Sequence, residues 1–170
     1  IHSGKQPCTF NYDESIFGLW TQYRDPLVYT PGDNETADCH KPGESGNVAG
    51  SSGGYTDYAN GDPNSYLGLI RQIFFSQPGR TLGGGNMRVL SQAQANNPSP
   101  DDAQFVENVM WEESNVLFVT VNVPGRSNDD ADVWNGAASA SGEQAQEPAL
   151  RDAADLRWLD AAFAQAKSDH

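Results

Sequence analysis

The sequence predicts an α/β or α+β fold, a sandwich in which helices cover a mixed β-sheet. Segments with helical periodicity alternate with short β-prone runs in the order helix, strand, helix, strands, helix. The chain of 170 residues has the length of one ordinary domain, and it shows neither an internal repeat nor a clean domain boundary. We therefore expect residues 1–170 to be a single domain or an internal segment of a larger one.

Charge and hydropathy argue against two classes of function. Ten Lys and Arg residues stand against 23 Asp and Glu residues, which gives a net charge of −13 at pH 7. Such a chain offers no broad basic surface for extended nucleic-acid binding or for an anionic membrane. The mean hydropathy is −0.62. No apolar run approaches the roughly 18 residues of a transmembrane helix, so we expect no membrane span.

The two cysteines favour an exported protein. Cys8 and Cys39 can form one bridge, which fits an extracellular or periplasmic location better than a cytosolic one. Two reduced thiols are the alternative, although their spacing matches neither a catalytic nor a zinc-binding pattern. A bridge would contribute roughly 3.5–4 kcal/mol in the chain-entropy model. The opening Ile1-His2-Ser3-Gly4 lacks a Met and an apolar leader, so we expect a mature or excised segment.

The first predicted element is a helix over residues 14–24, with Asp13 as its N-cap. Its apolar face consists of Ile16, Leu19, Trp20 and Tyr23. Residues 27–30 form a short β-prone run that feeds a tight polar turn over residues 31–35. Residues 41–63 are rich in Gly, Ser, Asn and Asp and predict a long surface loop.

The middle of the chain predicts a second helix and the start of a sheet. Residues 65–76 return to helical spacing, and Pro78-Gly79 ends that helix. Residues 86–91 predict a short strand. Residues 105–111 and 116–123 follow as an antiparallel hairpin.

The second hairpin strand and the last helix carry the strongest patterns. Residues 116–123 are almost continuously apolar, which predicts a buried strand at the centre of the sheet. Truncating Phe118 would then cost about 3–5 kcal/mol. Residues 147–167 predict a helix packed on the sheet. Its expected inner face is Leu156, Leu159 and Phe163, and its expected outer face is Asp152, Asp155, Arg157 and Asp160.

The turn over residues 31–35 is the sharpest chemical feature. Asp33, Asn34 and Glu35 present a carboxylate, an amide and a second carboxylate directly after a predicted strand. Such oxygen ligands suit hard or borderline divalent ions, and Gly32 lets the backbone turn sharply. The alternative is a capped turn, in which Asp33 and Asn34 bond nearby backbone amides.

Four segments resemble the calcineurin-like metallophosphoesterase superfamily, in a bacterial and exported branch. The first is Pro26-Leu27-Val28-Tyr29-Thr30-Pro31-Gly32-Asp33-Asn34-Glu35 with Asp38-Cys39-His40, and Pro7-Cys8 lies upstream as the disulfide partner. Residues 106–111 (VENVMW) and 119–125 (VTVNVPG) resemble the hairpin of that branch, and residues 158–163 (WLDAAF) resemble its following helix. The resemblance covers most of the chain. It implies a four-layer fold, a site for two divalent metal ions and a small phosphoester substrate.

The resemblance also assigns roles to residues. Residues 32–35 align with the family's Gly-Asn-His-Asp/Glu loop, so Asp33 would be a metal ligand and Asn34 would stand in the place of the catalytic His. An amide is no useful proton donor, which argues against general-acid catalysis from that position. His2 would lie beside the metals and contact a phosphate, unless it is a flexible terminal residue.

Three further residues are possible cleft residues. Glu35 belongs to the turn, and His40 is a candidate ligand or a structural hydrogen-bonding group beside Cys39. Asn122 follows the central strand and would border the cleft or serve as a turn residue. The family's early Asp-x-His, its Gly-Asp carboxylate and its late Gly-His-x-His do not occur here, so we expect an internal segment of a larger phosphoesterase-like domain.

Two functions are compatible with these observations. The first is a metal-dependent phosphoester hydrolase, in which two bridged divalent ions activate water. The second is a non-catalytic secreted binding or structural domain with a degenerate metal site, which the Asn at position 34 favours. The flanking sequence discriminates between them, because it either supplies the missing Asp and His ligands or does not. The residues predict neither the metal's identity nor the oligomeric state.

Overall fold

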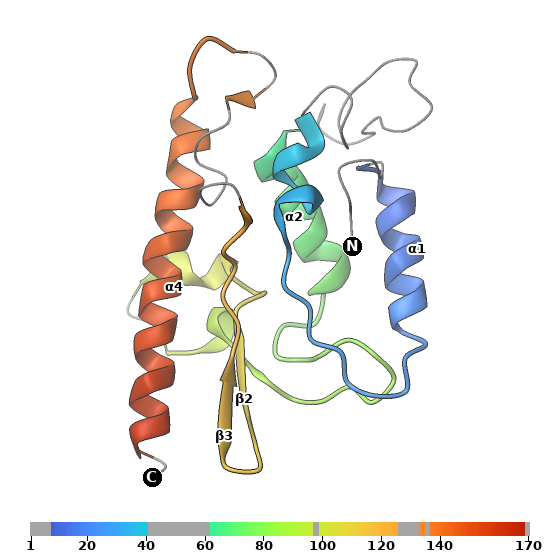
Figure 1. Cartoon of the computed structure of the whole chain (residues 1–170), viewed down its shortest axis with the longest axis vertical. Helices are drawn as coiled ribbons and strands as arrows, with labels where there is room; N and C mark the ends of the chain where they lie inside the picture. The colour runs from blue at the N-terminus through green and yellow to red at the C-terminus, as the bar shows by residue number, and fades with distance from the viewer. Residues whose placement is uncertain (1–7, 41–61, 97–98, 126–132, 135–136, 169–170) are drawn as a thin grey trace.

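The computed structural model describes residues 8–40, 62–96, 99–125, 133–134 and 137–168. The helices and strands within these ranges are α1 (Phe10–Trp20), η1 (Asp33–Glu35), η2 (Ala37–His40), α2 (Pro63–Phe74), β1 (Leu90–Ser91), η4 (Gln92–Gln94), η5 (Pro100–Gln104), β2 (Val109–Glu113), β3 (Val116–Val119) and α4 (Gly142–Ser168). This confirms a mixed α/β architecture. The sheet has the order β1-β2-β3 and both pairs are antiparallel, so the described strands do not form the expected mixed sheet. Across the molecule, α4, the β2–β3 hairpin, α2 and α1 follow one another (Figure 1).

Helix α1 begins four residues before the predicted helix. Its N-cap is Thr9, whose hydroxyl oxygen accepts a hydrogen bond from the Tyr12 amide at 3.3 Å. Asp13 is therefore no cap but lies in the first turn, where its buried carboxylate accepts a hydrogen bond from the Tyr66 hydroxyl. The predicted apolar face is divided, since Ile16, Phe17 and Trp20 pack on the core while Leu19 and Tyr23 are exposed.

Helix α2 matches its prediction to within two residues at each end. Asp62 caps it, because its Oδ1 accepts a hydrogen bond from the Ser65 amide at 2.8 Å, and Pro63 occupies the first turn. The buried face of α2 forms one core with α1 and with the predicted disulfide, Cys8–Cys39, which is present with a Cα–Cα distance of 5.7 Å. The buried members of this core are Cys8, Tyr29, Cys39, Tyr66, Leu69, Ile70, Ile73 and Phe74.

Two predicted strands are shorter than the patterns suggested. Of residues 27–30, Leu27 alone pairs, in an isolated antiparallel bridge with Leu82 that has two hydrogen bonds of 2.9 Å. Of residues 86–91, the last two form β1. Aromatic packing instead holds the first segment, since the Tyr29 ring lies 5.0 Å from the Trp20 ring and 5.1 Å from the Phe74 ring. The predicted loop over residues 41–63 falls almost wholly outside the described residues.

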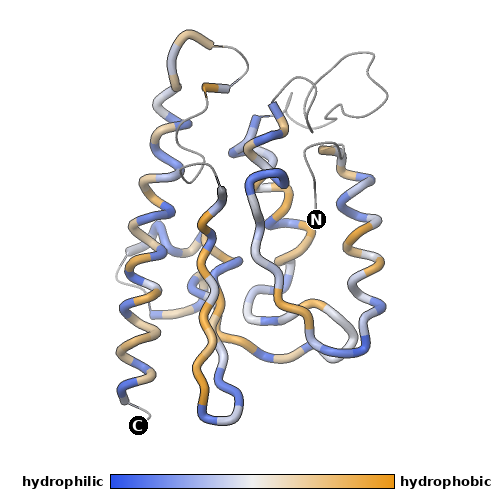
Figure 2. Tube along the Cα trace, in the orientation of Figure 1, coloured by the Kyte–Doolittle hydropathy of each residue, from blue (hydrophilic) through white to orange (hydrophobic). Residues whose placement is uncertain are grey.

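The β2–β3 hairpin is present, but the positions of its two strands in the sheet differ from the prediction. Ser114 and Asn115 have φ values of 54° and 62°, which gives a two-residue turn of type I′ instead of the four-residue connection expected. The central strand is β2 and β3 is at the edge, so the prediction of a central strand over residues 116–123 is wrong. Phe118 is 43% exposed and stacks on Trp111, and the expected loss of 3–5 kcal/mol on its truncation no longer applies. Figure 2 shows that β3 is nevertheless apolar along its length, whereas the end of β2 and the turn are hydrophilic.

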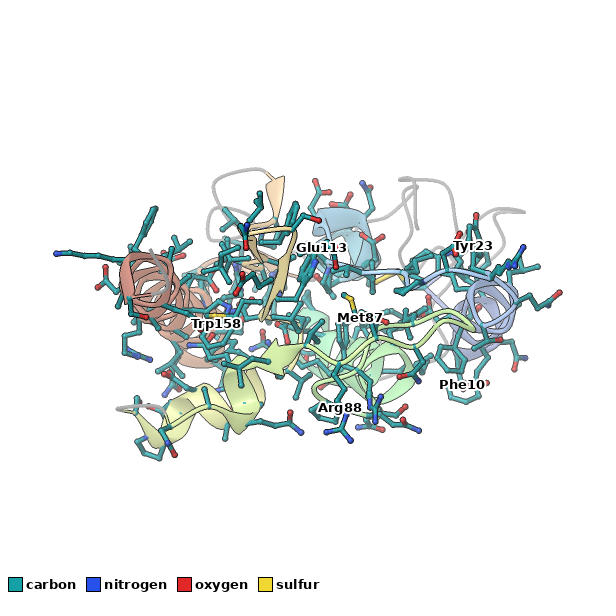
Figure 3. All side chains as sticks on the ribbon, turned by 90° about the horizontal axis from the view of Figure 1, so that it is seen from below. Phe10, Tyr23, Met87, Arg88, Glu113 and Trp158 are labelled. Carbon is teal, nitrogen blue, oxygen red and sulfur yellow. A yellow bond between two sulfur atoms is a disulfide. The ribbon has the colours of Figure 1, made fainter. Side chains whose placement is uncertain are left out.

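Helix α4 starts five residues earlier than predicted and turns a different face inward. Leu156 and Phe163, predicted to be buried, are 65% and 74% exposed. Trp158 instead lies on the side of α4 that faces the hairpin (Figure 3), where it packs with Met110 and Ala162. The buried face consists of Gln144, Pro148, Arg151, Ala154, Asp155, Trp158 and Ala162. No helix in the described ranges has both the length and the apolar character needed to cross a bilayer.

Candidate functional site

The turn over residues 32–35 is held by its own hydrogen bonds. The Gly32 amide donates to Glu35 Oε2 at 3.0 Å. Asp33 Oδ1 accepts hydrogen bonds from the Asn34 backbone amide at 2.9 Å and from Asn34 Nδ2 at 3.1 Å. These bonds are those of the capped turn that the sequence offered as an alternative. Glu35 is buried and serves the turn, and Asn34 orients Asp33.

The second carboxylate oxygen of Asp33 points at a distant part of the chain. A Cβ atom at Gly125 would lie 3.0 Å from Asp33 Oδ2, so the carboxylate rests directly against that glycine. Among the described residues, none donates a hydrogen bond to Oδ2. One oxygen of Asp33 is thus fixed by Asn34, while the other lies against Gly125.

The other predicted cleft residues lie near the same pair of segments. Asn122 lines a cavity of about 20 Å³ together with Thr36, Pro124 and Trp134. His40 is buried, and its ring centroid lies 6.5 Å from that of Trp134. The segment after Asp33 and the segment before Gly125 therefore enclose one small cavity. His2 lies outside the described residues.

Metal-ligating side chains do not cluster in the described part of the chain. Within it, no three His, Cys, Asp or Glu side chains lie close enough together to hold a metal ion. Asp33 has one oxygen oriented by the Asn34 amide and the other against Gly125. Asn122 is not a turn residue but a buried member of a polar network.

That network, which we call the polar seam, separates the α1–α2 core from the contact between α4 and the hairpin. Its members are Arg71, Gln92, Glu107, Asn108, Asn122, Arg151 and Asp155. The guanidinium group of Arg71 donates from Nη2 to Glu107 Oε1 at 2.6 Å and from Nε to Oε2 at 3.0 Å. Glu107 Oε1 also accepts a hydrogen bond from Asn122 Nδ2 at 3.0 Å. Arg151 closes this half of the seam by donating to the Asn122 carbonyl oxygen at 3.0 Å.

The other half of the seam attaches α4 to the sheet. Asn108 Nδ2 donates to Gln92 Oε1 at 2.8 Å and to Asp155 Oδ1 at 2.7 Å. Gln92 Nε2 donates to the Ala154 carbonyl oxygen at 2.9 Å. Asp155 was predicted to face water and is instead buried. The second oxygen of its carboxylate, Oδ2, has no hydrogen-bond partner among the described residues.

Sequence reasoning missed most of the seam, although two signals were present. Glu107 and Asn108 interrupt an otherwise apolar approach to β2, and Arg151 and Asp155 are four residues apart and so share one face of α4. Arg157, also predicted to face water, pairs with the fully buried Asp102 of η5. Buried polar groups need partners, so such interruptions indicate an internal network.

Burial raises the pKa of Asp155 from 3.8 to about 6. The hydrogen bond from Asn108 and the charge of Arg151 act in the opposite direction, while Glu107 and Asp152 add to the rise in the pKa. A carboxyl group whose pKa is raised on folding contributes its full stabilisation below its ordinary pKa. That stabilisation is lost as the pH rises through the window from about 4 to about 6.

We expect Asp155→Asn to stabilise the protein at pH 7.5 by about 1–3 kcal/mol, because the amide carries no charge to desolvate. The advantage should disappear near pH 4, where the carboxyl group of Asp155 is itself neutral. Urea unfolding of both proteins at pH 4, 5, 6 and 7.5 measures this difference. Asp160→Asn, at another exposed position of α4, is the matched control and should leave the pH dependence unchanged. A difference between Asp155→Asn and the parent that is constant with pH would contradict the assignment.

Comparison with protein-family models, with curated proteins and with solved structures found no match to this chain. Evidence on the function of the chain therefore comes from the motif resemblance and from the geometry. Two geometric observations are relevant to function. Asp33 is in contact with Gly125, and Thr36 and Asn122 line the same cavity.

Proposed function

We propose that this chain belongs to a metal-dependent phosphoester hydrolase in which Asp33 binds one of two divalent ions. One observation carries the proposal. Asp33 and Gly125 belong to two of the segments that resemble metallophosphoesterases, and they are in contact although 92 positions separate them. Residues that converge from distant segments on one carboxylate are typical of a site.

The proposed site assigns different tasks to neighbouring residues. Bound divalent ions would supply a hydroxide nucleophile at neutral pH and polarise the phosphoryl group of a small phosphoester. Asp33 Oδ2 would be the metal-binding atom, and the Asn34 amide, which donates to Oδ1, would fix the orientation of the carboxylate. Asn34 is then a positioning residue and not a proton donor. Glu35 holds the turn through the Gly32 amide.

The remaining parts of the site would come from outside the described residues. We propose that further Asp and His ligands do so, and that His2 contacts the phosphate. The three-stranded sheet would form part of a four-layer sandwich. The disulfide between Cys8 and Cys39 supports an extracellular or periplasmic location.

Asp33→Ala tests the proposal in the natural full-length protein. We expect metal content and the hydrolysis of a generic phosphomonoester and phosphodiester to fall together, the rate by about 100-fold or more, while the fold persists. Elemental analysis, steady-state rates and thermal unfolding measure the three quantities. Asp101→Ala, which removes an exposed carboxylate elsewhere, is the control and should change none of them.

Gly125→Ala provides a second, independent test of the same site. The added methyl group would lie 3.0 Å from Asp33 Oδ2 and crowd the carboxylate out of its position, so metal content should again fall. Unchanged metal content in both variants would reject Asp33 as a ligand. A full-length parent without metal and without activity would favour the non-catalytic secreted domain. The hydrogen bond from Asn34 Nδ2 to Asp33 Oδ1 is compatible with that alternative as well.

A further inference from the structure

The ribbon formed by residues 79–89, directly after α2, places two arginines opposite each other. Arg80 and Arg88 pair in an isolated antiparallel bridge. The flanking hydrogen bonds run from the Thr81 amide to the Met87 carbonyl and from the Val89 amide to the Gly79 carbonyl, each at 3.0 Å. This pattern makes Arg80 and Arg88 a non-hydrogen-bonded pair. In such a pair the two side chains leave the same face of the ribbon at the closest cross-strand spacing.

The pair concentrates positive charge on an otherwise acidic protein. Both arginines are exposed, and neither forms a salt bridge within the described residues. Arg80 Nη1 donates to Asn86 Oδ1 at 3.3 Å, which fixes that guanidinium group without neutralising it. Figure 3 shows Arg88 at the lower side of the view. Like charges directly opposite each other in a ribbon are destabilising, so the arrangement favours a bound anion.

A groove of about 180 Å³ adjoins this pair, with Arg80 among its lining residues. Its apolar part comes from Phe17, Phe74 and Leu82. Two hydroxyl-bearing residues, Thr21 and Ser76, line it as well. The groove therefore offers an apolar surface for an organic group next to a cationic one.

We propose that Arg80 and Arg88 bind the phosphate group of a small phosphomonoester whose apolar part lies in this groove. Guanidinium groups match the oxygens of a phosphate in geometry and charge, and two of them balance the nearly dianionic monoester at neutral pH. The net charge of −13 disfavours a longer polyanion. The site is separate from Asp33 and does not depend on the proposed hydrolase activity.

Calorimetric titration of the full chain at low ionic strength tests the site with inorganic phosphate, inorganic sulfate and phenyl phosphate. We expect phenyl phosphate to bind more tightly than either inorganic ion, because its ring would enter the groove. The double variant Arg80→Gln/Arg88→Gln should weaken binding at least tenfold. Lys167→Gln, an exposed cation near the end of α4, should leave the affinity within twofold.

Thermal unfolding supplies a second measurement that guards against a misfolded variant. Phenyl phosphate should raise the unfolding temperature of the parent but not that of the double variant. Without ligand, Arg88→Gln should be at least as stable as the parent, because it removes a like-charge contact. Absent binding in the parent, unchanged binding in the double variant, or an equal loss in Lys167→Gln would each overturn the proposal. Equal affinity for phenyl phosphate and inorganic phosphate would overturn the role of the groove. We expect Asp33→Ala to bind phenyl phosphate as tightly as the parent does. A failure of the arginine site can then be distinguished from a failure of the metal site.

Discussion

Replacing Glu107 by alanine is expected to destabilise the protein by about 3–5 kcal/mol. The Glu107 side chain is fully buried, and it accepts hydrogen bonds from the Arg71 guanidinium and from Asn122 Nδ2. Its removal would leave the guanidinium group of Arg71, which is 15% exposed, without its counter-charge. It would also deprive a buried amide of its acceptor. Denaturant unfolding at pH 7 measures the loss.

Two further variants separate this effect from general surface charge. Glu113→Ala removes an exposed carboxylate at the hairpin end and should change the free energy of unfolding by less than about 0.5 kcal/mol. The double replacement Arg71→Met/Glu107→Leu removes both charges together and should recover most of the stability, because apolar groups of similar volume fill the space. A loss below about 1 kcal/mol in Glu107→Ala would show that the ion pair does not organise the seam.

Trp158→Ala is expected to cost about 3–5 kcal/mol as well. Trp158 is 1% exposed and fills the space between α4 and the hairpin, where it packs with Met110 and Ala162. Phe163→Ala is the matched control, because Phe163 is an aromatic residue on the same helix and is 74% exposed. That variant should stay within about 0.5 kcal/mol of the parent. The opposite result, with Phe163 the costlier site, would mean that α4 packs through the face predicted from the sequence.

The comparison of these two aromatics explains where sequence reasoning succeeded and where it failed. The existence of α1, α2 and α4 followed from helical periodicity, which is a local property. The buried face of α4 could not be predicted in the same way, because the prediction assumed that α4 packs through an apolar interface. The actual interface combines Trp158 with polar partners such as Asp155, whose hydrogen bonds come from residues far away in the sequence. The distribution of apolar residues around a helix does not reveal polar partners that come from elsewhere in the sequence.

The sheet and the candidate site show the same limit. An apolar run such as residues 116–119 predicts a strand but not whether that strand lies at the centre or the edge, since the order of strands is a long-range property. The polar turn at Asp33, Asn34 and Glu35 was found from its composition. Gly125 was not recognised as its neighbour, because the contact joins two loops that have no sequence relationship.

The disulfide between Cys8 and Cys39 also determines what a protease can release from this protein. The bond closes residues 8–39 into one covalent ring that contains both α1 and the Asp33 turn. A single backbone cut between residues 9 and 38 opens the ring but leaves both new ends attached through sulfur. On a gel without reductant such a nicked chain would migrate as one species, and it would separate into two fragments after reduction. The Asp33 turn and α1 therefore stay on one molecule after a single cleavage, as long as the surroundings are oxidising.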